Sequence, residues 1–295
     1  MSPRVLVLGG DGMLGRMLRL QLARQPGWRV DWTSRRDEPG AFRFDAESPG
    51  SLLDLARERG GYDYAVNSIA VLKNAAENTG PDGAAAAERV NALFPHELAG
   101  LAAEIGCKVI HVSTDAVFAP DSGPCLETDP PTPADHYGRT KLRGEPSAPN
   151  ALTLRCSIIG PNPVKKTGLL EWVLGQPRDG TVTGYDDQLW RGVTTLQFAK
   201  LCARIFEENL FGKLRDQSAV HHFCPNETVT KYRLLQLLRE RFRPDLEVKR
   251  SAGGAVTRIL ETAGMLRGIC GTDLPMDVAI AELSTYIDGP TAAGA

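Results

Sequence analysis

The 295-residue sequence lacks several features that mark whole classes of protein. It has no run of about 18 apolar residues, so no membrane-spanning helix is expected. Its net charge is only −2, whereas nucleic acids and acidic membranes are bound by strongly basic patches. The six cysteines form no CxxC pair, and no His/Cys/Asp cluster has zinc-like spacing. We therefore expect reduced thiols, no bound metal, no nucleic-acid or membrane partner, and a cytoplasmic location.

What the sequence does contain is a core-forming composition with alternating strand and helix patterns. Hydrophobic residues make up 42% of the chain. Strands are predicted at 5–8, 27–32, 64–67, 107–113 and 151–155, and helices at 13–24, 51–59 (Ser51 as N-cap), 84–105 and 137–144. This alternation predicts an α/β fold with a Rossmann-type, doubly wound parallel sheet, whose ligands bind at the carboxyl ends of the strands.

The strand–helix rhythm loosens after about residue 169. Helices are predicted at 195–209, 230–241 and 275–286, and residues 288–295 are expected to be frayed. We predict an NAD(P)-binding domain over residues 1–160 and a smaller, mainly substrate-binding lobe over 161–295, with chain segments that can interleave.

A glycine-rich loop follows the first predicted strand. Gly9, Gly12 and Gly15 form a GxxGxxG pattern between a strand and a helix. Missing side chains let backbone N–H groups approach a pyrophosphate, and a helix N-terminus favours its negative charge. A lone glycine pattern can also be a plain tight turn, but its position between strand and helix favours a dinucleotide site.

The end of the second predicted strand bears on the choice of nicotinamide cofactor. In NAD sites an acid near this point holds the ribose 2′-OH, whereas arginine pairs well with the 2′-phosphate of NADP. Here the segment reads Ser34-Arg35-Arg36, which favours NADPH. Asp31 is the competing acid, and the arginines could be ordinary surface charges, so NADH stays open.

A catalytic set is predicted from Thr114, Tyr137 and Lys141. Tyr137 and Lys141 are four residues apart, which places them on one helix face. A nearby ammonium would lower the pKa of the phenol, which could then donate a proton to a carbonyl oxygen. Thr114, after the fourth strand, could hydrogen-bond the same oxygen. Each motif is common alone; the signal lies in their combination with the glycine loop.

With these residues in place, the chain resembles the short-chain dehydrogenase/reductase superfamily, and most closely the dTDP-4-dehydrorhamnose reductase-like nucleotide-sugar reductases. The resemblance rests on GGDGMLG (9–15), VNSIA (66–70), VNALFPHELA (90–99), HVSTDAVFAP (111–120), YGRTKLRGE (137–145), LRCSIIGP (154–161) and GVTTLQFAKL (192–201). It implies reduction of a 4-keto group on a nucleotide-linked 6-deoxyhexose, with Thr114, Tyr137 and Lys141 as the catalytic trio. It also implies a cofactor site that includes Gly9, Gly12, Met13, Leu14, Asp45, Ala70, Val71 and Leu72.

Two segments depart from the family pattern. Val71-Leu72-Lys73-Asn74 replaces a polar histidine/threonine-type run at the cofactor edge. Residues 186–191 stand where relatives bind sugar, but their sequence differs from the pattern usual in enzymes of the rhamnose pathway. Trp190 could stack on a sugar or base, or simply anchor the lobe, and Arg191 could meet a phosphate. Asp115 and Gln188 complete the candidate substrate contacts, and the sugar itself stays open.

Three functions are compatible with this pattern. The first is an NADPH-dependent reductase of a nucleotide sugar. The second is an epimerase or dehydratase on the same fold, although a dehydratase would be expected to carry two acids after Thr114, and the sequence has only Asp115. The third is a non-catalytic NADP-binding regulatory subunit, which would typically have lost Tyr137 or Lys141. A homodimer is compatible with all three. The adjacent His221-His222 pair has no acidic or cysteine partner at a spacing that suits catalysis or metal binding, which favours a structural role.

Overall fold

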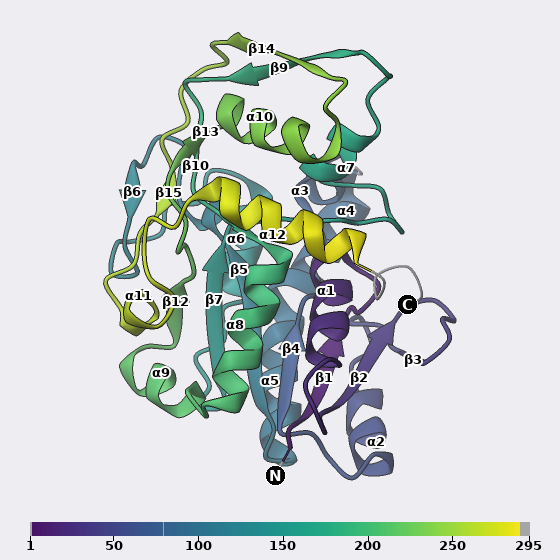
Figure 1. Ribbon diagram of the computed structural model, residues 1–295. Helices are drawn as coiled ribbons and strands as arrows, with labels where there is room; N and C mark the ends of the chain where they lie inside the picture. The colour runs from purple at the N-terminus through teal and green to yellow at the C-terminus, as the bar shows by residue number, and fades with distance from the viewer. Residues whose placement is uncertain (1, 79, 290–295) are drawn as a thin grey trace.

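The protein is built on one parallel seven-stranded sheet in the order β12-β7-β5-β4-β1-β2-β3 (Figure 1). The computed structural model describes residues 2–78 and 80–289, so most of the predicted frayed end lies outside the described residues. The strands are β1 (Arg4–Leu8), β2 (Arg29–Ser34), β3 (Ala41–Arg43), β4 (Tyr64–Asn67), β5 (Lys108–Thr114), β7 (Ala151–Cys156) and β12 (Val220–His222). The predicted Rossmann-type α/β fold is confirmed.

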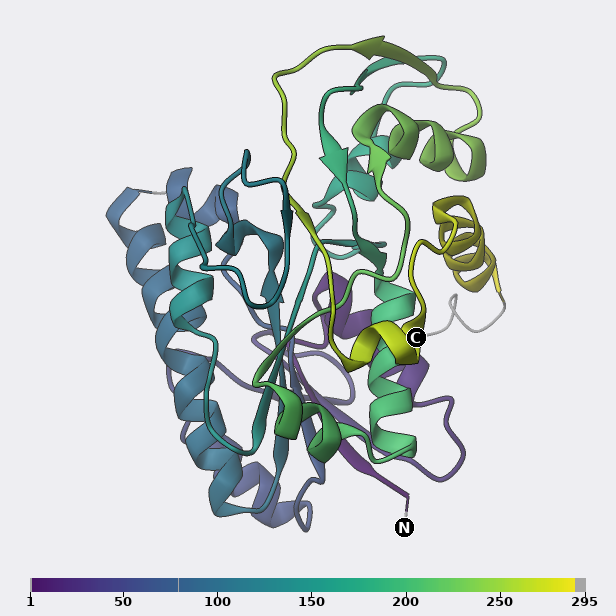
Figure 2. The same cartoon turned by 90° about the vertical axis from the view of Figure 1, so that its left-hand side faces the viewer.

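Helices cover both faces of this sheet (Figure 2). On one face α1 (Met13–Leu22) packs beside α8 (Thr195–Glu207), and on the other α2 (Ser51–Glu58) packs near α5 (Phe94–Glu104). Alternate residues of β1 point into the two cores: Val5 and Val7 into one, Leu6 and Leu8 into the other. A strand buried on both faces reads as an unbroken apolar run, which is why β1 could be recognised in the sequence.

The strand register brings the functional segments to one edge of the sheet. Leu8 pairs with Asn67, and Asn67 with His111, while Thr114 pairs with Cys156. All of these pairings are parallel, so the loops that follow β1, β4, β5 and β7 leave from the same side. That edge is where a doubly wound sheet binds its ligands.

Two helix predictions need correction. The expected continuous helix over 84–105 is three segments: α4 (Gly80–Ala87), a π-helical turn (Glu88–Leu93) and α5. A π turn keeps the chain helical, so apolar periodicity could not reveal it, and such turns often accompany functional sites. Ser51 is the first residue of α2, and Gly50 is its N-cap.

The C-terminal half forms a lobe of short paired strands and helices beyond the carboxyl edge of the sheet (Figure 1). Its helices include α7 (Leu169–Leu174), α10 (Lys231–Phe242) and α12 (Met276–Asp288), whereas α9 (Phe211–Gln217), which contacts β7, and α11 (Met265–Cys270), next to β12, lie alongside the sheet (Figure 1). The strand pairs are β6 (Pro124–Cys125) with β15 (Ile259–Leu260), β8 (Ile158–Ile159) with β11 (Val193–Thr194), β9 (Thr181–Tyr185) with β14 (Glu247–Ser251), and β10 (Leu189–Trp190) with β13 (Val229–Thr230). β12 from this half joins the main sheet beside β7. The division at residue 160 stays a prediction.

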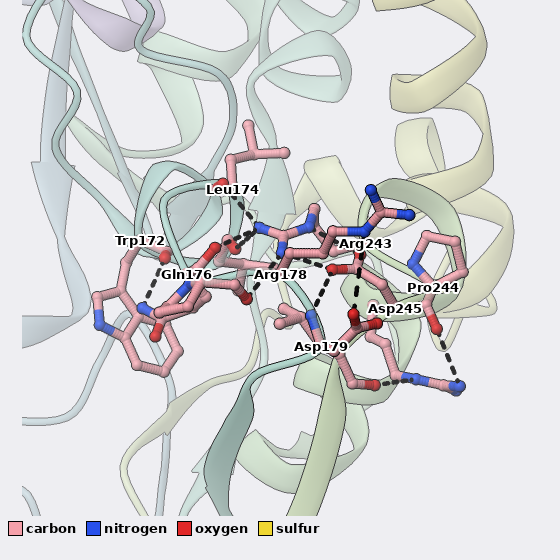
Figure 3. A network of polar contacts seen from close by, with 12 residues as sticks. Trp172, Leu174, Gln176, Arg178, Asp179, Arg243, Pro244 and Asp245 are labelled. Atoms are coloured by element: carbon pink, nitrogen blue, oxygen red, sulfur yellow. Dashed lines mark hydrogen bonds and ion pairs between the residues drawn. The ribbon is translucent and has the colours of Figure 1, made fainter.

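Arg243, directly after α10, fixes the end of α7 (Figure 3). Its guanidinium donates to the carbonyls of Leu174 at 2.8 Å and Gln176 at 2.9 Å, and pairs with Asp245 at 2.7 Å. The last carbonyls of a helix have no partner within the helix, so the guanidinium supplies donors that the helix lacks. Within the described residues, no helix is long and apolar enough to cross a membrane.

Candidate active site

A cavity of about 510 Å³ opens at the carboxyl edge of the sheet. The predicted catalytic and cofactor-binding residues come from six separate loops or elements, yet all of them line it. They are Gly9, Gly12, Met13, Leu14, Ser34, Arg35, Arg36, Asp45, Ala70, Val71, Leu72, Thr114, Tyr137 and Lys141, and Asp115 joins them. The structure thus brings the predicted set together, while the role of each residue remains to be tested.

The glycine loop forms a backbone cradle at the start of α1. Gly9 has φ of 79°, a left-handed conformation that glycine adopts without strain. The N–H of Gly12 donates to the carbonyl of Gly9 at 2.9 Å, and a Cβ on Gly15 would collide with that carbonyl. Gly12 caps α1 without a side chain, so it offers no side-chain oxygen to the helix's first N–H groups.

The end of β2 carries the segment predicted to choose between NADP and NAD. Ser34 is buried, and its hydroxyl accepts from the N–H of Arg36 at 3.0 Å. The Arg36 guanidinium lies 3.2 Å from Asp11 and 3.0 Å from Glu38. The competing acid, Asp31, is instead engaged by Arg29 at 2.9 Å and by the Tyr62 hydroxyl at 2.7 Å. Asp31 and Arg36 are thus both paired with protein groups, but Arg35 and Arg36 line the cavity and Asp31 does not.

Helix α6 (His136–Arg143) presents Tyr137 and Lys141 to the cavity. Asp135 caps its N-terminus by accepting from the N–H of Gly138 at 2.7 Å, and Lys73 pairs with the other oxygen at 2.8 Å. A Cβ on Gly138 would collide with the carbonyl of Ala116, so only glycine lets α6 approach the end of β5 this closely. Lys73 thus helps to fix the start of the helix.

Thr114 and Asp115 form the other wall of the catalytic corner. The Thr114 hydroxyl donates to Asp115 at 3.1 Å and accepts from the N–H of Ala116 at 3.1 Å. Asp115 is also bound by Arg258, whose Nε lies 3.3 Å from its second oxygen. Arg258 reaches in from the C-terminal lobe, 143 residues further along the chain, and sequence spacing gave no sign of it.

The expected lowering of the Tyr137 pKa by Lys141 is not what the structure gives. Burial raises the pKa of Tyr137 above its ordinary value, and the Asp115 carboxylate raises it further, while a hydrogen bond with Thr114 acts the other way. Lys141 is turned toward β5, where its amine donates to the carbonyl of Val112 at 2.7 Å. Burial lowers the pKa of Lys141 to about 8, partly offset by Glu145.

Several residues that line the cavity, or that hold a lining segment in place, were not predicted. Asn91, in the π-helical turn, accepts from the N–H of Val71 at 2.8 Å and donates to its carbonyl at 2.9 Å, which fixes the predicted cofactor segment. The sequence signal that could have revealed this contact is an asparagine within an alanine-rich helix, because a buried polar side chain needs a hydrogen-bond partner. The end of β7 and the chain after it contribute Cys156, Ser157, Ile158, Asn162, Lys165, Thr167 and Gly168.

Three candidate substrate residues lie outside the set that lines this cavity. Trp190 donates from its ring nitrogen to Ser157 at 2.8 Å. Gln188 donates to the carbonyls of Gly253 and Gly254, both at 3.2 Å. Arg191 is largely buried and pairs with Asp273 at 3.0 Å. These contacts anchor the lobe, and a role toward substrate stays a prediction.

The two adjacent histidines are buried and bound to the backbone. His221 lies 2.9 Å from the carbonyl of Leu214, and His222 lies 2.8 Å from that of Glu261. Among residues 2–78 and 80–289, no group of three or more His, Cys, Asp or Glu side chains is arranged to hold a metal ion.

Comparison with known proteins places this geometry in a family. A family model described as RmlD substrate binding domain matches residues 3–252. A dTDP-4-dehydrorhamnose reductase of Mycobacterium tuberculosis is 33% identical over 171 residues, covering 54% of this chain and 51% of that protein. The methionine adenosyltransferase 2 subunit beta of Rattus norvegicus is 31% identical over 144 residues, covering 49% of this chain and 42% of that protein.

A solved structure shows the same fold over almost the whole chain. It is a dTDP-4-dehydrorhamnose reductase of Bacillus anthracis in complex with NADP, with a TM-score of 0.75, 16% identity, and coverage of 97% and 99% of the two chains. In sequence, by contrast, the chain spans about half the length of the curated relatives it matches.

Proposed function

We propose a function from one premise: this chain belongs to the RmlD substrate binding domain family. The protein is an NADPH-dependent reductase that acts on the 4-keto group of a nucleotide-linked deoxysugar. The observation that carries this proposal is the single cavity that joins the glycine loop and Arg35-Arg36 to Tyr137 and Lys141. The relatives named dTDP-4-dehydrorhamnose reductase support the same reaction class.

The residues present fit a dinucleotide phosphate. The cradle at Gly9 and Gly15 has no room for a Cβ, and α1 begins beside it. Backbone N–H groups would hold the pyrophosphate there. Arg35 and Arg36, at the end of β2, would hold the 2′-phosphate. Asn162 offers a buried carbonyl oxygen that lacks a protein partner, in a residue that lines the same cavity.

The chain's own part in the reaction is proton transfer and positioning. The bound nicotinamide supplies the hydride. Tyr137 donates its phenolic proton to the carbonyl oxygen of the substrate, and Lys141 lies one helical turn away on the same face. Thr114 stands beside the phenol, and its hydroxyl donates a hydrogen bond to Asp115. For Thr114 to donate to the carbonyl oxygen of the substrate instead, its hydroxyl must rotate away from Asp115.

Two alternatives are less well supported by the site. A dehydratase would use a second acid after Thr114, where this chain has Ala116. A regulatory subunit is raised by the similarity to the methionine adenosyltransferase subunit. Against it stands the retention of both Tyr137 and Lys141, which line the cavity.

The proposal is tested with a panel of nucleotide-linked 4-keto-6-deoxysugars. NADPH oxidation is followed by absorbance, and the configuration of each product at C4 is read by NMR. We expect turnover with at least one member of the panel and a single product epimer. If the protein binds NADPH but oxidises it with none of the sugars in the panel, it is a binding subunit. A product altered at a carbon other than C4 would indicate the epimerase or dehydratase.

The cofactor preference gives a separate prediction. Replacing both Arg35 and Arg36 with alanine should weaken NADPH binding roughly 10²- to 10⁴-fold, because two hydrogen bonds to a charged group are lost and each contributes about 1.5–3 kcal/mol. NADH affinity should change little, since NADH has no 2′-phosphate. Fluorescence titration with both cofactors measures this. Arg57→Ala, at an exposed ion pair on α2, is the matched control. Equal losses for NADPH and NADH would show that the pair does not read the 2′-phosphate.

A further inference from the structure

His111 is a buried titratable residue that the proposed reaction does not use. It lies within β5 and is 1% exposed. Its Nδ1 is 3.2 Å from the amide nitrogen of Asn67, and its Nε2 is 3.3 Å from the amine of Lys141. The three side chains therefore form a line from β4 through β5 to the cavity.

The direction of the hydrogen bonds along this line is set by Asn67. The amide oxygen of Asn67 accepts from the backbone N–H of Ile69 at 3.2 Å, and this contact sets the orientation of the side-chain amide. Its NH₂ group therefore faces Nδ1 of His111, and Nδ1 must accept. A neutral imidazole has one donor and one acceptor, so its proton resides on Nε2.

The Nε2–H of His111 then points at Lys141. An ammonium group has three donors and no acceptor, so it would oppose this N–H, whereas a neutral amine has a lone pair to receive it. One N–H of Lys141 is already given to the carbonyl of Val112. We propose that His111 is a positioning residue that Asn67 locks in the Nε2–H form, so that it donates to Lys141 and favours the neutral amine.

The groups around Lys141 also favour its neutral amine. Burial lowers the pKa of Lys141 to about 8, and Glu145, which follows α6, acts in the opposite direction. Cys156 on β7 also faces the amine, but burial raises the pKa of that thiol, which keeps it uncharged at neutral pH. Tyr137, on the same helix, keeps its proton at neutral pH. Burial, followed by the charge of Lys141, holds the pKa of His111 well below its usual range.

The link to catalysis rests on the proposed function. A lysine held near its pKa exchanges its proton readily at neutral pH, whereas an ordinary lysine stays charged. After each turnover the ammonium form of Lys141 then passes a proton toward the catalytic corner and becomes the neutral amine, which takes up a proton from solvent.

The tautomer can be read directly by NMR of protein labelled with ¹⁵N-histidine. The chain has five histidines, and His222 is an internal control, because its Nδ1 faces the carbonyl of Glu261 and must carry the proton. We expect His111 as the neutral Nε2–H form and His222 as the neutral Nδ1–H form from pH 6 to 9. In ¹³C-lysine-labelled protein, a signal absent from Lys141→Arg should titrate near pH 8. An Nδ1–H form of His111, or a Lys141 that titrates at its ordinary value of about 10.4, would overturn the proposal.

Asn67→Asp gives the sharper comparison. One carboxylate oxygen keeps the bond to Ile69, while the group that faces Nδ1 changes from a donor to an acceptor. We expect His111 to switch to the Nδ1–H form, His222 to stay unchanged, and the Lys141 pKa to rise by at least one unit. A His111 that keeps its proton on Nε2 in the folded variant would contradict the proposal. If the variant does not fold, the wild-type spectra decide alone. None of these spectra needs a substrate, so a missing reductase activity would remove the proposed function but not the proposed donation from His111 to Lys141.

Discussion

Tyr137→Phe is expected to lower kcat for NADPH-dependent reduction by roughly 10²- to 10⁴-fold, the usual contribution of a general acid. The substitution removes only the phenolic oxygen and keeps the ring that lines the cavity. NADPH affinity should therefore stay within a few-fold of wild type. Steady-state rates with a 4-keto nucleotide sugar, together with cofactor titration, separate the two effects.

A matched control makes the same chemical change elsewhere. Tyr185→Phe removes a hydroxyl from a 37% exposed tyrosine on β9, away from the cavity-lining residues, and should leave kcat unchanged. A Tyr137→Phe variant that keeps full activity would show that the proton comes from another group.

The pH dependence of the reduction follows from the protonation state of Tyr137. The phenol must be protonated to act as an acid, and its pKa is raised by burial and by Asp115. A raised pKa keeps the acid form through neutral pH, so loss of rate from this group should begin only at alkaline pH.

Arg155→Met is expected to destabilise the fold by about 3–5 kcal/mol, the usual cost of leaving one member of a buried ion pair alone. Arg155 on β7 binds Glu145 with two hydrogen bonds, of 2.8 and 2.7 Å, and their side chains are only 5% and 6% exposed. The Ser113 hydroxyl also donates to Glu145 at 2.7 Å, directly before Thr114. Chemical denaturation measures the free energy of unfolding.

Two comparisons identify the source of the loss. The double variant Glu145→Gln/Arg155→Met removes both charges and should recover part of the stability. Arg57→Met breaks an exposed pair with Asp54, 68% and 72% exposed, and should cost less than about 1 kcal/mol. A loss for Arg155→Met as small as that for Arg57→Met would mean that Glu145 finds another partner or becomes protonated.

The parts of the site that were predictable are those that local patterns encode. The apolar run of β1 and the spacing of Gly9, Gly12 and Gly15 located the glycine loop, and Gly9 and Gly12 line the cavity. Tyr137 and Lys141 could be placed on one face because helical spacing decides this. The parallel strand order then brought Thr114 to the same edge.

The parts that were missed depend on contacts between distant segments. Arg258 reaches Asp115 from 143 residues away, and no spacing rule connects them. His111 reads as one polar residue in an apolar strand, and only the fold shows that it lies between Asn67 and Lys141. The pKa of Tyr137 was predicted in the wrong direction because the sequence revealed a neighbouring lysine but not the burial or the direction of its amine.

The central claim is hydride transfer from the nicotinamide to C4 of a nucleotide-linked sugar. It is tested most directly with NADPH that carries deuterium at C4 of the nicotinamide, prepared separately in its two stereochemical forms, and a 4-keto nucleotide sugar. NMR of the product should show deuterium at C4 of the sugar with one form of the cofactor and none with the other. A product without deuterium at C4 from either form would contradict the account.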